Sequence, residues 1–174
     1  MACREIGLSD EQFFEAIRQF KGAAKRLQLL AKTKFSIAYQ DFAHAPSKVK
    51  ATINALKDQF PKRQLIAALE LHTFSSLNKK FLKEYCESMN GADRAYVFFS
   101  EHTLKMKKLP AITEKDIQKA FAHPNLKVIT NDNKRLHRSL KRFKWEDKNL
   151  LLMSSGTFGG TDLKELAKNC LKKK

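Results

Sequence analysis

Glycine and cysteine are scarce in this sequence, and long apolar runs are absent from it. Its 174 residues include six glycines and three cysteines, at positions 3, 86 and 170. The cysteines are odd in number, far apart and without a CxxC spacing, which argues against a disulfide framework or structural zinc and favours a reducing cytoplasm. The few glycines leave no stretch that matches a P-loop. No run approaches the roughly 18 apolar residues of a membrane span, so no membrane partner is expected.

Acidic residues are also in short supply. There are 34 Lys and Arg residues against 18 Asp and Glu, which gives a formal net charge of +16. Such a balance attracts polyanions: nucleic acid, an anionic membrane, or a small substrate that carries phosphates and carboxylates. Composition alone does not choose among these three. At the N-terminus Arg4, Glu5, Asp10 and Glu11 interrupt any apolar stretch, so we expect no signal peptide.

Apolar residues recur first at helical spacing and then in short runs. Residues 1–30 are predicted to be helical, with Ser9 as a cap. A shift in charge composition suggests a boundary near residue 32. Beyond it we expect strands at 35–39, 65–69, 95–99, 127–129 and 150–153. The helices expected between them are one capped by Ser47 and ending before Pro61, and others at 79–89, 114–122, 132–143 and 161–171. This alternation is typical of a parallel sheet with helices on both faces.

Three loops that follow predicted strands have an unusual composition. They are residues 41–46, 70–78 and 154–160. In a parallel sheet, ligands bind beyond the carboxyl ends of the strands, in the loops that lead into helices. We therefore expect the three loops to face one edge of the sheet and to form the functional site.

Each loop has a functional and a structural interpretation. Asp41 could accept hydrogen bonds from ribose hydroxyls and His44 could face phosphate, or Asp41 caps a turn and His44 is an ordinary loop residue. The hydroxyl-rich 70–78 loop could bind an anion at a helix start, or one serine simply caps that helix. The 154–160 loop holds three glycines that permit close backbone approach to a ligand, or it is a flexible turn.

A basic segment and the histidines complete the candidates. Residues 134–142 carry five bases among apolar Leu136 and Leu140, so this helix could lie on a phosphate backbone or, as an ordinary helix, dock by its leucines with a solvated basic face. The three histidines in the second half share no ligand spacing with each other or with the cysteines, and no metal site is expected: His102, His123 and His137.

The motif Asp41-Phe-Ala-His44-Ala-Pro46 resembles the DYxHxP or DFAHHP motif that opens the third domain of the Mur ligase family. Residues 20–27 resemble its FxGxxRR segment, and residues 70–73 resemble its EPRSNT or QPHRYT segment. Residues 153–160 resemble the MSNGGFGG loop of the murein peptide ligase branch. The branch of UDP-N-acetylmuramate–L-alanine ligase matches the first motif and, less well, the last.

This resemblance implies an ATP-dependent amide ligase of peptidoglycan synthesis or recycling. In the family an acyl phosphate forms on UDP-N-acetylmuramate, and the amine of an amino acid or peptide attacks it. The central domain supplies the P-loop, the carbamylated lysine and the Mg²⁺ ligands, so ATP and Mg²⁺ belong to the full-length enzyme and the metal ligands lie outside this chain. The expected fold is α/β, a Rossmann-like mostly parallel sheet with helices on both faces, preceded by a short helical segment.

The resemblance also assigns residues. It implies nucleotide contacts for Asp41 and His44, and acceptor contacts for His72, Thr73, Ser75, Ser154, Ser155, Gly156 and Phe158. No catalytic residue is assigned within this chain. Leu71 and His72 stand where the family has Pro and Arg, so a carboxylate-binding arginine is missing there, and Ala45 replaces a second histidine.

The resemblance divides the chain in two. Residues 1–31 would close the central ATPase domain, and residues 32–174 would form the acceptor-binding domain. The expected partners are therefore the substrates and the N-terminal and central domains of the same cytoplasmic enzyme, and the chain is not expected to catalyse alone. The alternative is a basic α/β nucleic-acid-binding module, whose binding would weaken steeply with salt.

Overall fold

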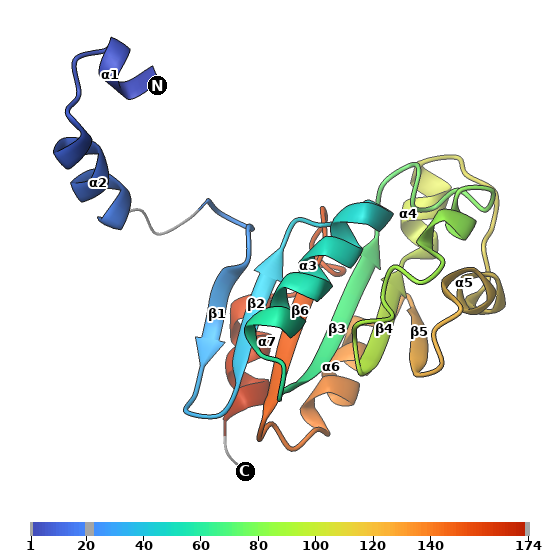
Figure 1. Ribbon diagram of the computed structural model, residues 1–174. Coiled ribbons are helices and arrows are strands. Elements are labelled where there is room, and N and C mark those ends of the chain that lie inside the picture. The colour runs from blue at the N-terminus through green and yellow to red at the C-terminus, as the bar shows by residue number, and fades with distance from the viewer. Residues whose placement is uncertain (1, 20–22, 173–174) are drawn as a thin grey trace.

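The computed structural model describes residues 2–19 and 23–172. Within them six strands form one sheet in the order β1-β2-β6-β3-β4-β5 (Figure 1). β1 runs antiparallel to β2, and the other neighbours are parallel. The predicted α/β fold with a mostly parallel sheet is therefore confirmed. The strands are β1 Gln28–Lys32, β2 Ile37–Asp41, β3 Gln64–Leu71, β4 Arg94–Phe99, β5 Leu126–Thr130 and β6 Lys148–Met153.

Helices cover both faces of the sheet (Figure 1). One face packs against α3 Pro46–Gln59, the 3-10 helix η1 Leu82–Tyr85, α4 Glu101–Met106 and α5 Glu114–Phe121. The other face packs against α6 Asn133–Lys141 and α7 Leu163–Leu171. Along β3, Leu65, Ala67 and Leu69 enter the first core and Ile66 and Ala68 the second. A strand buried on both faces needs apolar residues throughout, which explains its sequence.

Two short helices, α1 Ala2–Glu5 and α2 Asp10–Gln19, precede the sheet and stand away from it (Figure 1). The predicted cap is confirmed, because Ser9 Oγ accepts the N–H of Gln12 at 3.3 Å. In the reverse direction, Gln12 Oε1 accepts the N–H of Ser9 at 2.9 Å. The predicted contributions of Phe20 and Gly22 lie outside the described residues. In the described part of the chain no helix is long and apolar enough to cross a bilayer.

The helix predicted over residues 23–31 is wrong. Lys25 and Leu27 have φ angles of 55° and 41°, which interrupt a right-handed helix. The chain then enters β1, which pairs with β2. Leu30 is buried in the second core, whereas Leu29 is 52% exposed on the other side of this edge strand. Pairing with β2 thus overrides the helical spacing of the leucines.

Three further expectations need correction. Residues 79–89 form turns and η1 instead of an α-helix, with Glu87 at a φ of 59°. α3 begins at Pro46 without a side-chain cap, so Ser47 does not cap it; proline suits the first turn because it lacks an N–H there. The strand expected at 35–39 begins two residues later, at Ile37. Thr33 Oγ1 accepts the N–H groups of Phe35 and Ser36, which form a turn before the strand.

Cys170 is expected to resist alkylation in the folded protein. Its side chain is 3% exposed on α7, and burial raises the pKa of its thiol to about 12. At pH 8 about one thiol in ten thousand is then the reactive thiolate. Iodoacetamide followed by mass spectrometry should therefore show modification of exposed Cys86 and of Cys170 only after unfolding in guanidinium. Equal rates at the two positions in native protein would contradict the placement of α7.

Candidate functional site

The carboxyl ends of three neighbouring strands bring the predicted loops together. β2, β6 and β3 lie side by side and parallel, with Asp41 opposite Met153 and Met153 opposite Leu69. The N–H of Ser154 donates to the carbonyl of Asp41 at 3.0 Å, which ties the third loop to the first. The prediction that the loops share one edge of the sheet is confirmed.

Glu70 lies at the centre of this edge. It occupies the seventh position of the eight-residue β3 and is 4% exposed. Its Oε2 atom accepts hydrogen bonds from Ser154 Oγ and from the N–H of Phe158, the latter at 2.8 Å. Ser154 Oγ in turn accepts the N–H of Gly156 at 2.6 Å. A buried carboxylate therefore fixes the first half of the glycine-rich loop to β3.

Gly156 leaves room for the carboxylate and for His72. A Cβ atom built at Gly156 would lie 2.7 Å from Glu70 Oε2 and 2.8 Å from His72 Cγ. The His72 side chain is 41% exposed, and its Nδ1 lies 3.9 Å from Glu70 Oε1. We call these residues the Glu70 cluster: Glu70, His72, Ser154, Gly156 and Phe158. Of them, His72 offers the accessible side chain.

Sequence reasoning assigned no role to Glu70. The sequence feature that indicates such a role is the position of Glu70 directly after the apolar run 65–69. An acid there is expected to be buried, and a buried carboxylate needs hydrogen-bond donors. The donors come from residues 84 and 88 positions away. Such a distance cannot be read from local spacing.

The hydroxyl groups of the 70–78 loop divide into two sets. Thr73 and Ser76 bond to each other, with Oγ1 to Oγ at 2.9 Å, and each hydroxyl also accepts the other residue's N–H. They close a turn, and no α-helix follows for a serine to cap. Ser75 is exposed. Of the predicted acceptor residues in this loop, Ser75 and His72 are thus the accessible ones.

The 154–160 loop also mixes buried and accessible groups. Ser154 and Phe158 are fully buried, and the Phe158 ring lies 6.1 Å from that of Phe98. Phe158 reaches the core because its φ is 48°, which turns the chain inward. Ser155 Oγ is buried without a hydrogen-bond partner among the described residues. A buried hydroxyl without a partner is the group in this loop best suited to receive one from a ligand.

Asp41 is 7% exposed and acts as a cap. Its Oδ2 accepts the N–H of Leu27 and its Oδ1 accepts the N–H of Ala43, both at 2.7 Å. The carboxylate therefore holds the segment before β1 to the end of β2. His44 Nδ1 lies 2.9 Å from the carbonyl of Phe42. These bonds favour the structural interpretation of Asp41, and nucleotide contacts for Asp41 and His44 stay predictions.

We expect Asp41→Ala to lower the free energy of unfolding by about 1–3 kcal/mol, because it leaves two backbone N–H groups without their acceptor. Urea denaturation monitored by circular dichroism measures this. Asp58→Ala is a suitable control, since the exposed Asp58 side chain makes no hydrogen bond or ion pair among the described residues. If the two variants are equally stable, the cap interpretation is wrong.

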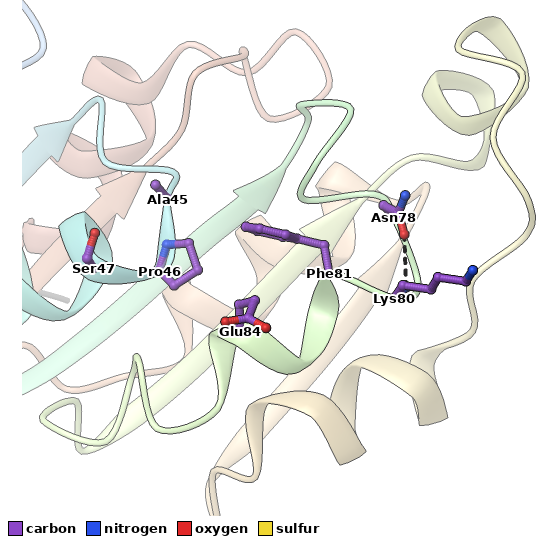
Figure 2. Close-up of a pocket in the computed structure, with 7 residues that line it drawn as sticks. All are labelled: Ala45, Pro46, Ser47, Asn78, Lys80, Phe81 and Glu84. Atoms are coloured by element: carbon purple, nitrogen blue, oxygen red, sulfur yellow. Dashed lines mark hydrogen bonds between the residues drawn. The ribbon is translucent and has the colours of Figure 1, made fainter.

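A cavity of about 640 Å³ opens beside this edge, between the start of α3 and the segment that leads into η1. Figure 2 shows the Phe81 ring pointing toward Pro46 and Ala45, with Glu84 beside it. Such a volume suits a small ligand. The walls come from segments more than 30 positions apart, and sequence reasoning missed the cavity. Its remaining lining residues are Ser47, Asn78 and Lys80.

The described residues contain no group of three or more His, Cys, Asp or Glu side chains that could hold a metal ion. The basic helix is α6, which docks through buried Leu136 and Leu140 with most of its bases exposed. The interpretation as an ordinary docked helix is therefore confirmed for its apolar face.

The family now follows from comparison with known proteins. Residues 25–156 match the family described as "Mur ligase, glutamate ligase domain". The chain belongs to the Mur ligase family. The resemblance noted at the Asp41 motif is thereby confirmed, and the sheet edge described above is an edge of a Mur ligase C-terminal domain. Helices α1 and α2 lie before the matched residues.

Individual relatives agree with this assignment. UDP-N-acetylmuramate–L-alanine ligase of Desulfitobacterium hafniense strain Y51 is 28% identical over 118 residues, which cover 66% of this chain and 26% of that protein. The chain thus spans about a quarter of the length of such relatives. The crystal structure of a murein peptide ligase from Psychrobacter arcticus superposes with a TM-score of 0.66 at 20% identity, covering 97% of this chain and 34% of that one. A UDP-N-acetylmuramate–alanine ligase from Thermotoga maritima gives 0.67 at 13% identity, covering 90% and 32%.

Proposed function

We propose that this Mur ligase C-terminal domain binds the incoming amino acid or peptide for an ATP-dependent ligase. The complete enzyme would join that acceptor to UDP-N-acetylmuramate through an acyl phosphate, in the cytoplasm. The observation that carries the proposal is the Glu70 cluster. It joins two loops of a Mur ligase domain around a glycine whose Cβ position is already filled by a carboxylate and an imidazole.

Accessible and unpaired groups lie around the cluster. The Ser75 side chain is exposed and that of His72 is 41% exposed. The buried Ser155 hydroxyl has no partner among the described residues and can donate to a carboxylate that reaches it. Thr73, Ser154 and Phe158 support these groups from beneath, since their own polar or aromatic atoms are occupied. Acceptor recognition in this proposal therefore falls to His72, Ser75, Ser155 and the backbone at Gly156.

A nucleotide contact is proposed at the other side of the same edge. Each Asp41 oxygen accepts one backbone N–H and keeps a second lone pair, which a ribose hydroxyl could use. His44 is half-buried next to it. ATP would supply the phosphoryl group that activates the carboxylate, and Mg²⁺ would be held by residues outside this chain.

The exposed apolar side chains of the N-terminal helices are consistent with a contact to a further domain. α1, α2 and their connection expose apolar side chains, which a soluble protein usually covers: Ile6, Leu8, Phe13, Phe14 and Ile17. We propose that residues 1–31 close the central domain of the complete enzyme. Residues 28–31 nevertheless belong to the edge strand of this sheet, so the proposed boundary crosses β1.

Acceptor binding can be tested on the chain itself by NMR. We expect L-alanine or L-alanyl-γ-D-glutamyl-meso-diaminopimelate to shift amide signals in residues 70–76 and 154–160. Ser155→Ala should weaken binding about 10-fold, because it removes a hydrogen bond to a charged group. Gln118→Ala, at an exposed position on α5 outside these loops and the 640 Å³ cavity, should not. Saturating shifts confined to other parts of the sheet would contradict the proposal.

The chain alone should hydrolyse no ATP and ligate no acceptor, because the sequence has no P-loop for the triphosphate. A coupled assay for phosphate release, with UDP-N-acetylmuramate and each acceptor present, measures this. Steady ligation by these 174 residues would contradict the proposal that the ATP triphosphate is bound outside this chain.

A further inference from the structure

A second cavity lies between α6 and the strands β4 and β5. It has a volume of about 240 Å³ and is lined by Tyr96, Lys127, Ser139, Arg142 and Phe143. Tyr96 and Lys127 are paired near the starts of β4 and β5, whereas the cluster lies where β3 and β6 end. Tyr96 is opposite Ala68, two residues before Glu70 on β3, and the cavity shares no lining residue with the Glu70 cluster.

The lining is cationic and rich in donors. Lys127 Nζ donates to Ser139 Oγ at 3.3 Å, which leaves the serine proton free to donate. No acidic residue lines the cavity, and neither Lys127 nor Arg142 has a carboxylate within 4 Å among the described residues. Two positive charges with no partner here favour an anion.

The tyrosine adds a neutral donor. The hydroxyl of Tyr96 has no hydrogen-bond partner in the part of the chain that the structure describes. Burial raises the pKa of this phenol, against a smaller opposing effect of the positive charge of Arg94. The phenol therefore keeps its proton at neutral pH and can donate it to a ligand.

The carboxyl end of α6, next to the cavity, repels an anion only weakly. A helix carboxyl end normally repels negative charge through its free carbonyls. The carbonyl of Leu140 accepts hydrogen bonds from Trp145 Nε1 at 3.2 Å and from the N–H of Phe143 at 3.4 Å. Arg142 is the C-cap residue, so its charge lies where this negative potential is largest.

We propose that this cavity binds a small phosphate monoester through its phosphoryl group. A phosphate dianion has three terminal oxygens and can accept from an ammonium, a guanidinium and two hydroxyls that approach from different sides. The rings of Tyr96 and Phe143, packed edge to face at 6.4 Å, provide an apolar wall for the carbon part of the ester. The volume is below the roughly 300 Å³ of ordinary ligand pockets, so a phosphosugar fits better than a whole nucleotide.

Tryptophan fluorescence can report on this cavity directly. Trp145 is the one tryptophan in the sequence, and its ring lies 5.7 Å from that of Phe143. Titration with ribose 5-phosphate should change the emission saturably, with a Kd below about 1 mM. Inorganic phosphate should compete, and ribose should have no effect. Absence of saturation up to about 10 mM would overturn the proposal.

Charge variants then separate a built site from a diffuse positive field. Lys127→Gln and Arg142→Gln, both at exposed positions, should each weaken ribose 5-phosphate binding at least about 10-fold. Lys141→Gln removes the same charge from the same helix outside the cavity and should change the affinity less than about twofold. Circular dichroism confirms that each variant folds.

Two results would overturn this assignment. One is an equal loss of affinity in Lys141→Gln. The other is tighter binding of a 20-nucleotide single strand than of ribose 5-phosphate, with a steep salt dependence that all three substitutions reduce alike. That second result would favour a nucleic-acid surface on α6. Neither result bears on acceptor binding at the Glu70 cluster, which uses other residues and is measured separately.

Discussion

Replacing Gly156 by valine is expected to weaken acceptor binding about 100-fold and to destabilise the domain. The new Cβ would lie 2.7 Å from Glu70 Oε2, and the carboxylate cannot retreat, because Ser154 and Phe158 both donate to it. Overpacking of this kind costs about 1–3 kcal/mol. A loop displaced by about 1 Å can lose about 100-fold in binding or rate. Urea denaturation and the NMR titration with L-alanine or the tripeptide measure the two effects.

Gly160→Ala is the matched control for this substitution. Gly160 lies in the same loop, and a Cβ atom there would meet nothing within 4 Å, although its φ is +80°. The backbone strain should cost about 1–2 kcal/mol and leave acceptor affinity nearly unchanged. If Gly160→Ala impairs binding as much as Gly156→Val does, general loop strain explains the loss, and close packing against Glu70 and His72 does not.

Glu70→Ala should lower the free energy of unfolding by about 3–5 kcal/mol. It removes the acceptor of two hydrogen bonds to a buried carboxylate, each worth about 1.5–3 kcal/mol. The loop from Ser154 to Phe158 should then open locally before the sheet unfolds. Hydrogen exchange at the Phe158 amide should therefore accelerate far more than exchange at amides in the middle of β3.

Two other variants make the Glu70 measurement specific. Glu70→Gln keeps the shape and one acceptor oxygen, so we expect a smaller loss of about 1–2 kcal/mol. Glu84→Ala, at an exposed position beside the 640 Å³ cavity, should stay within about 0.5 kcal/mol of the parent. If Glu70→Ala costs less than the Gln variant, the carboxylate does not hold the loop.

The sequence predicts those parts of the fold that depend on periodicity and buried strands. Residues 65–69 are apolar throughout because both faces of β3 are covered, and that pattern is visible without a structure. The sequence predicts helix where β1 lies, because the strand character of β1 comes from pairing with β2 and from positive φ angles at Lys25 and Leu27. Neither the pairing nor the φ angles can be predicted from the spacing of apolar residues.

The candidate site divides in the same way. Topology alone predicts that the loops after β2, β3 and β6 meet, since parallel strands end at a common edge. The bonds from Glu70 to Ser154 and Phe158 join residues more than 80 positions apart, and no local pattern reveals them. The Thr73 hydroxyl closes a turn with Ser76 and Phe158 is buried in the core, which local spacing does not show, and acceptor contacts for both residues stay predictions.

The position of β6 between β2 and β3 also bears on how the sheet is completed. It is the last of the six strands of this sheet in the sequence, yet it supplies the partner for two earlier strands. Without residues 148–153, no strand links β1 and β2 to β3, β4 and β5, and the edges of β2 and β3 that β6 covers would be open to wrong pairing. The hydrogen-bond donors to the Glu70 carboxylate, Ser154 and Phe158, also come after β6 in the sequence. Insertion of β6 therefore completes both the sheet and the Glu70 cluster.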